Sequence, residues 1–182
     1  MNEPITLGEL SELIHVADDE LRAALLLSAY AGLSSIELTA LQWVDVDLLG
    51  GAVKVGRGLG PEVRTIPLHP APAQHLALIR AGKDDRAEVF PGPGAVTRLR
   101  EKLRALEQFI HGRPTCFRDI QRWFFEMTEQ ASVEIAVFAY LVGNKNAREY
   151  VLYTKTGRMK AIPAENFRRV IECLKSPTRV RA

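Results

Sequence analysis

The sequence predicts a mainly α-helical domain with one small antiparallel β-sheet, an α+β fold. Apolar residues recur at helical spacing through most of the chain, whereas two β-like runs flank a Gly-rich turn between residues 52 and 68. The chain has 182 residues, of which 47% are hydrophobic and 25% charged, enough to bury one hydrophobic core. We expect a single domain over residues 1–174 and a mobile basic tail over residues 175–182.

The first two helices are marked by residues that favour helix ends. Residues 6–9, Thr-Leu-Gly-Glu, have the spacing of a capping box. Asp18 or Asp19 caps a second helix over residues 20–31, which is too apolar to lie on a surface and stops at Gly32. The apolar stripe expected on the first helix consists of Leu7, Leu10, Leu13 and Ile14.

The middle of the chain changes from helical to β patterning. Ser34 or its neighbour caps a third helix that runs to Trp43. Residues 52–55 and 63–68 then form a hairpin, in which Pro67 confines the second strand to a sheet edge. Further helices are predicted over residues 73–81, 95–110, 117–131, 133–142, 146–153 and 164–174.

Several classes of protein are excluded by the composition. No run approaches the roughly 18 apolar residues that span a bilayer, and the N-terminus lacks a secretory layout. The two cysteines lie far apart, and the four histidines show no metal-ligand spacing. We therefore expect no membrane partner, no metal site and no cofactor, and a cytoplasmic location that is nucleoid-associated if the chain binds DNA.

Charge is distributed unevenly along the chain. The first 90 residues contain 7 Lys/Arg and 13 Asp/Glu, a net −6, whereas the rest contain 17 and 9, a net +8. A cationic half fits a polyanion such as nucleic acid, although it equally fits a solvated helical surface. The run Arg98, Arg100, Lys102 and Arg104 alternates at two-residue spacing, so it spreads around a helix and does not form one stripe.

Three stretches carry motifs in a distinctive order. Residues 31–47 read AGLSSIELTALQWVDVD, and residues 64–68, at the exit of the hairpin, read RTIPL. Residues 115–118 read TCFR, and LVGN at residues 141–144 and Tyr153 follow. Together they resemble the Gly-Leu-Arg-x-x-Glu-Leu, Arg-x-Ile/Val-Pro-Leu and His-x-x-Arg boxes of the catalytic domain of tyrosine recombinases, the phage integrase family. The resemblance implies that fold.

The resemblance also implies a set of catalytic positions. In this family a tyrosine hydroxyl attacks a DNA phosphate, two arginines hold that phosphate, a lysine acts as general acid and histidines assist. Tyr153 and Arg118 match the nucleophile and one arginine, and Glu37 matches a structural support. The other positions are substituted: Ser34 for the first arginine, Arg57 for the lysine, Thr115 for the first histidine and Asn144 for the later His or Trp.

These substitutions predict a double-stranded DNA-binding protein that is defective in strand cleavage. A guanidinium does not release its proton near neutral pH, so Arg57 is a poor general acid. Such a pseudoenzyme fits a regulator, an architectural partner or a relic of a mobile element. The DNA contacts expected are Arg57, Arg64, Arg118, Arg122, Lys145 and Arg148. For Arg57 and Arg64, a solvated hairpin turn is an equally good interpretation.

Three alternatives stay open. One is an active divergent recombinase that uses Tyr153 with Arg57 or Lys54. Another is an interaction module that pairs with itself or with an active recombinase through the helix at residues 164–174, whose apolar face consists of Phe167, Val170, Ile171 and Leu174. The third is a helical domain with no nucleic-acid role. Family members usually carry a separate N-terminal DNA-binding domain, so a chain of this extent fits either a fragment or half of a DNA clamp.

Overall fold

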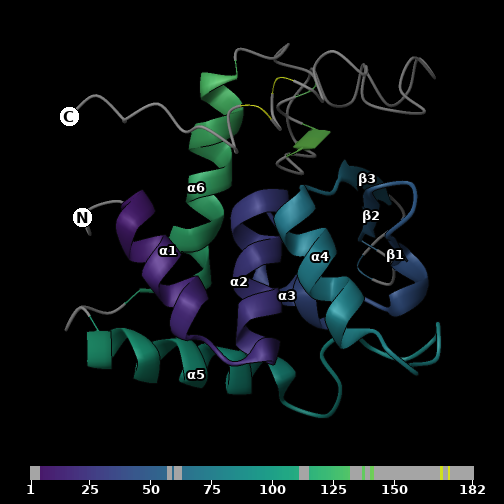
Figure 1. Ribbon diagram of the computed structural model, residues 1–182, viewed down its shortest axis with the longest axis horizontal. Coiled ribbons are helices and arrows are strands. Elements are labelled where there is room, and N and C mark those ends of the chain that lie inside the picture. The colour runs from purple at the N-terminus through teal and green to yellow at the C-terminus, as the bar shows by residue number, and fades with distance from the viewer. Residues whose placement is uncertain are drawn as a thin grey trace.

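A computed structural model describes residues 5–56, 59, 63–110, 115–131, 137, 140, 141, 169 and 172. In these residues helices surround a central helix, and a small three-stranded sheet lies to one side (Figure 1). The elements in chain order are α1 (Leu7–Val16), α2 (Asp19–Ala31), α3 (Ser35–Thr39), a 3₁₀ turn η1 (Trp43–Asp45), β1 (Val46–Asp47), β2 (Ala52–Val55), β3 (Arg64–Pro67), α4 (Pro70–Ile79), α5 (Ala95–Ile110) and α6 (Phe117–Gln130). The mainly helical α+β class is confirmed.

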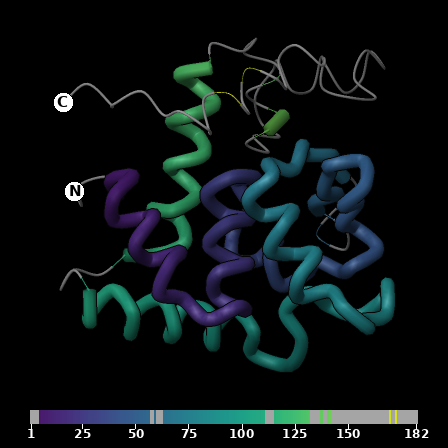
Figure 2. Tube along the Cα trace, in the orientation of Figure 1, coloured from purple at the N-terminus to yellow at the C-terminus, as the bar shows by residue number. Residues whose placement is uncertain are grey.

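Helix α2 is the centre of the hydrophobic core. It packs against α1, α4, α5 and α6, and Figure 2 shows α5 crossing beneath α1 and α2. Leu25 and Leu27 of α2 are fully buried, as are residues on its other faces such as Ala24. This surrounded position explains why the α2 sequence is apolar on every side after its first turn.

The predicted ends of the first two helices are confirmed. The Thr6 hydroxyl accepts a hydrogen bond from the Glu9 amide at 3.2 Å, and the Glu9 carboxylate accepts one from the Thr6 amide at 2.8 Å. Asp18 caps α2 through the Leu21 amide at 2.8 Å. The apolar stripe of α1 is narrower than expected, because Leu7 lies in the first turn and remains 44% exposed.

The third helix is shorter than predicted. It ends at Thr39, and the chain to Trp43 continues in extended and 3₁₀ conformation. The Trp43 amide donates to the carbonyl of Ala87 at 3.0 Å, and the Val89 amide donates to that of Leu41 at 2.9 Å. The backbone after Thr39 thus bonds to a segment far along the chain instead of continuing the helix.

The sheet has the order β1-β2-β3 with antiparallel pairing throughout. Val53 faces Val46 on one side and Ile66 on the other. Strand β3 lies at the edge, as Pro67 predicts, and its Thr65 amide donates to the hydroxyl of Tyr140 at 2.7 Å. The two-residue strand β1 was not anticipated, because it is too short to show alternation.

The later helices follow the predictions with one shift. Helix α4 begins at Pro70 instead of residue 73, because His69 caps it through the Ala71 amide and proline suits the first helical position. Helix α5 matches its predicted bounds, and α6 ends one residue early. Val137, Tyr140 and Leu141 are helical, as are Arg169 and Glu172.

Several predictions concern residues that the structure does not describe. The helix at residues 146–153, the tail at residues 175–182 and most of the helix at residues 164–174 lie outside the described residues. The predicted domain boundary therefore stays a prediction. Among the helices of the described residues, none has the length and apolar character needed to cross a bilayer, and no cluster of potential metal ligands occurs there.

Candidate nucleic-acid interface

The turn between α2 and α3 carries the first substituted position, Ser34. Gly32 ends α2 in the left-handed conformation, with φ 69°, and a Cβ atom placed there would lie 2.4 Å from the Phe124 ring of α6. The Gln121 amide, also on α6, donates to the Gly32 carbonyl at 2.7 Å. The position of this turn is therefore set by close contact with α6.

Ser34 itself is occupied by helix capping. Its amide and its hydroxyl both donate to Glu37 Oε2, at 2.9 and 2.8 Å. The hydroxyl also accepts the Glu37 amide at 3.4 Å, which completes a capping box at the start of α3. Ser34 thus organises the backbone of α3 and supplies no positive charge.

Glu37 joins this turn to the sheet through a buried ion pair. Its Oε1 accepts a hydrogen bond from the Arg64 guanidinium of β3 at 2.5 Å, and the two side chains are only 15% and 7% exposed. Burial alone would raise the pKa of the Glu37 carboxyl, but the Arg64 charge and the Ser34 hydrogen bonds outweigh it and lower that pKa. The family resemblance implies a structural role for Glu37, and its contacts with Ser34 and Arg64 fit that role.

Arg64 does not lie at a solvated hairpin turn. Its side chain is buried and its charge is balanced by Glu37. Both interpretations of the sequence assumed an exposed guanidinium, because Arg64 stands only a few residues from a Gly-rich turn. In this position the Arg64 guanidinium offers no uncompensated charge to a phosphate.

The start of α6 presents a second predicted arginine to solvent. Arg118 is exposed and makes no ion pair or side-chain hydrogen bond among the described residues. Because Arg118 and Gln121 are three residues apart on one helix, they share the face that touches the turn at Gly32. Thr115, just before α6, is half-buried. Arg122 is exposed and pairs with Glu126 one turn later, at 3.1 Å.

The α5 cations divide into two faces. Arg98 Nη2 and Lys102 Nζ both contact Glu20 of α2, each at 2.6 Å, and Lys102 also contacts Asp18 at 2.8 Å. The hydrogen bond from Arg98, supported by Lys102, lowers the pKa of Glu20. Arg98 and Lys102 thus hold α5 against the start of α2, and their charges are balanced.

The other two α5 cations face away from these carboxylates. Arg100 and Arg104 are exposed, and Arg100 Nη2 donates to the hydroxyl of Ser35 at 2.9 Å. Arg100 was not predicted from the sequence as a site residue. The spacing of the α5 cations could have indicated the two faces. Residues 100 and 104 are four apart and so share one face of the helix, as do residues 98 and 102.

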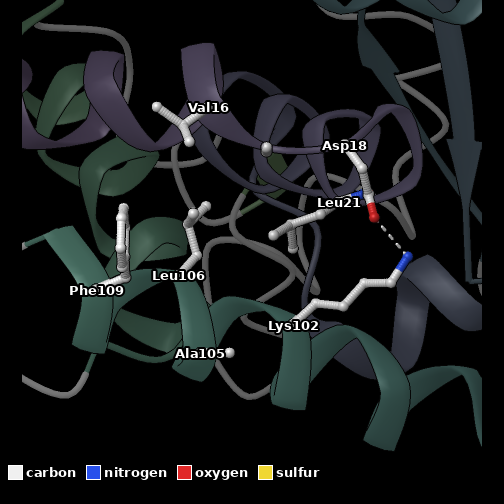
Figure 3. Close-up of a pocket in the computed structure, with 8 residues that line it drawn as sticks. Val16, Asp18, Leu21, Lys102, Ala105, Leu106 and Phe109 are labelled. Carbon is white, nitrogen blue, oxygen red and sulfur yellow. Dashed lines mark hydrogen bonds and ion pairs between the residues drawn. The ribbon is translucent and has the colours of Figure 1, made fainter.

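A groove lies where the turn between α1 and α2 meets α5. Its volume is about 350 Å³, and its walls are apolar except for the ion pair of Asp18 and Lys102 at one end (Figure 3). Phe109 and Val16 border it and are 86% and 49% exposed. Such a wall lacks the converging polar groups that orient a small ligand.

Five predicted site residues cannot be placed relative to this turn. They lie outside the described residues and are Arg57, Asn144, Lys145, Arg148 and Tyr153. Of the predicted site residues that the structure describes, Ser34 and Arg64 meet through Glu37. Arg118 lies on the helix that contacts the same turn, whereas Arg122 is engaged by Glu126.

Comparison with solved structures defines the fold. The integrase from mycobacterium phage Brujita matches with a TM-score of 0.76 at 19% identity, over 100% of this chain and 61% of that one. The XerA recombinase matches with a TM-score of 0.70 at 18% identity, over 99% and 67%. The Tn1549 transposon integrase matches with a TM-score of 0.61 at 18% identity, over 87% of this chain and 66% of that one.

These likenesses show that the chain has the tyrosine recombinase catalytic-domain fold, as its motifs predict. The chain spans 61% of the length of the phage integrase and about two thirds of the other two. No family model and no curated protein sequence matches it.

Proposed function

We propose that this chain binds double-stranded DNA through cationic side chains of its C-terminal half and does not cleave the DNA strand. The fold is shared with integrases and recombinases, and the Tn1549 integrase structure contains a circular intermediate DNA. The net charge of +8 over residues 91–182 supports a polyanionic partner. A cytoplasmic, nucleoid-associated location is part of this proposal.

The observation that carries the loss of cleavage is the contact set of Ser34. The family resemblance places a phosphate-holding arginine there, but the serine caps α3 and is held by Glu37. The guanidinium bonded to the same carboxylate, that of Arg64, is buried and neutralised. Neither residue offers an uncompensated charge to a phosphate.

The rate losses expected from the substituted catalytic positions support a protein that does not cleave DNA. Loss of one phosphate-stabilising donor or arginine costs about 10²–10⁵ in rate. Loss of a general acid costs about 10²–10⁴ more. The terms are not strictly additive, but together they leave a tyrosine nucleophile with negligible turnover.

A covalent-trap assay tests this proposal. The chain is incubated with labelled, nicked duplexes of randomised sequence, and protein–DNA adducts are separated on a denaturing gel, with Tyr153→Phe as control. We expect salt-sensitive binding and no adduct. An adduct that requires Tyr153 would establish the active, divergent recombinase instead, and absence of low-salt binding would remove the nucleic-acid role.

We also infer that residues 164–174, predicted from the sequence to form a helix, pair the chain with a second copy or with a related recombinase. The apolar residues Phe167, Val170, Ile171 and Leu174 recur there at helical spacing. Light scattering of the full chain and of a chain that ends at Gly157 tests this pairing. A monomeric mass for the full chain as well as for the shortened chain would contradict self-association.

A further inference from the structure

Arg100 differs from the other α5 cations in what holds it. Arg98 and Lys102 are bound by carboxylates, whereas Arg104 makes no side-chain hydrogen bond or ion pair among the described residues. Arg100 is exposed and hydrogen-bonded at 2.9 Å to a neutral hydroxyl, that of Ser35. Its position is therefore fixed while its charge remains uncompensated within the described residues.

The anchor places this charge beside Ser34. Ser35 follows Ser34 directly, and adjacent Cα atoms are about 3.8 Å apart. The Arg100 guanidinium thus lies within a side-chain length of the position that lacks an arginine. Arg64, the other guanidinium linked to this turn, is buried and paired with Glu37.

We propose that Arg100 contacts a DNA backbone phosphate beside Ser34, from helix α5 and without restoring an arginine at position 34. This inference rests on the proposed DNA binding. A guanidinium has five N–H donors in a planar fork, so one bond to Ser35 leaves donors for phosphate oxygens. Ser35 acts as a positioning residue, because its hydroxyl restricts where the long side chain points. The missing general acid is not restored, so tighter phosphate binding does not bring back cleavage.

The test compares two arginines on one helix face. Binding of a fluorescein-labelled duplex of mixed sequence is followed by anisotropy for the wild type, Arg100→Gln and the matched control Arg104→Gln. Both residues are exposed and lie one turn apart, but only Arg100 has the anchor. We expect Arg100→Gln to weaken binding roughly tenfold, the loss typical of a charged hydrogen bond. The slope of log K against log salt should decrease by about 1, and Arg104→Gln should change both values less.

A double-mutant cycle isolates the positioning role. Ser35→Ala keeps every charge but removes the anchor, so it should weaken binding in the wild type and in Arg104→Gln. It should have no further effect in Arg100→Gln, because the guanidinium is already gone. Circular dichroism checks that each variant is folded.

The outcomes separate this inference from the proposed function. If the wild type binds DNA and the Arg100 and Arg104 variants weaken binding equally, the positioned phosphate contact is wrong and DNA binding stands. An equal effect of Ser35→Ala with and without Arg100 would also overturn it. If the folded wild type does not bind at low salt, both proposals fail.

Discussion

Removal of one partner from the buried ion pair of Glu37 and Arg64 should strongly destabilise the fold. Glu37→Gln removes the negative charge and leaves the Arg64 guanidinium, only 7% exposed, against a neutral amide. It also weakens two charge-assisted hydrogen bonds from Ser34. Breaking a buried pair on one side costs about 3–5 kcal/mol. That is a large share of the roughly 5–15 kcal/mol by which domains are stable.

Denaturant unfolding measures this loss, and the chain offers a matched control. Glu126 also pairs with an arginine, but the partner Arg122 is 60% exposed and one helical turn away. Glu126→Gln should therefore cost at most about 0.5 kcal/mol. Replacing both buried partners, with Glu37→Gln and Arg64→Met together, should recover much of the loss, because no buried charge is left unpaired. Equal costs for Glu37→Gln and Glu126→Gln would refute the reasoning.

Three further predictions follow from the same contacts. Because the pKa of Glu37 is lowered in the folded state, its contribution to stability should be fully present above the ordinary pKa of a glutamate and lost as pH falls through the lowered folded value. The stability gap between wild type and Glu37→Gln, measured across that range, should therefore shrink in acid. Gly32→Ala should lower the free energy of unfolding by about 2–5 kcal/mol in denaturant, because it combines a positive φ with a clash against Phe124. Gly51→Ala is the control: it also has a positive φ but open space around it, so it should cost about 1–2 kcal/mol. Glu20→Gln should lower the melting temperature by removing the carboxylate that binds Arg98 and Lys102, and high salt should reduce the difference from wild type.

Local signals in the sequence were sufficient for most of the helices. The capping residues Thr6 and Asp18, the Gly32 stop and the 16-residue amphipathic pattern of α5 depend on neighbours within a few positions. The end of the third helix was mispredicted because it depends on a distant partner. The backbone near Trp43 bonds to residues 85–89, and no local pattern encodes that pairing.

The candidate site was harder to predict because it depends on which charged side chains contact one another in the folded chain. Motif order located Ser34 and Arg118, but it could not show that the Arg64 guanidinium turns inward to Glu37. Nor could it show that Arg100 reaches Ser35, since the two residues are 65 positions apart. Such contacts arise only when α3, α5 and β3 are assembled.

The packing also changes what the uneven charge of the sequence means. The acidic first half and the basic second half are not separate surfaces, because Asp18, which caps α2, and Glu20 of α2 neutralise Lys102 and Arg98 of α5. Net charge therefore overstates the cationic surface available to DNA. Among the cations that remain, Arg100 is hydrogen-bonded to Ser35, next to the turn between α2 and α3, and Arg118 lies on α6, whose Gln121 contacts the same turn. Affinity should accordingly depend on a few positioned arginines more than on the total charge, so a surface Lys or Arg outside this turn should contribute less to the salt dependence of binding.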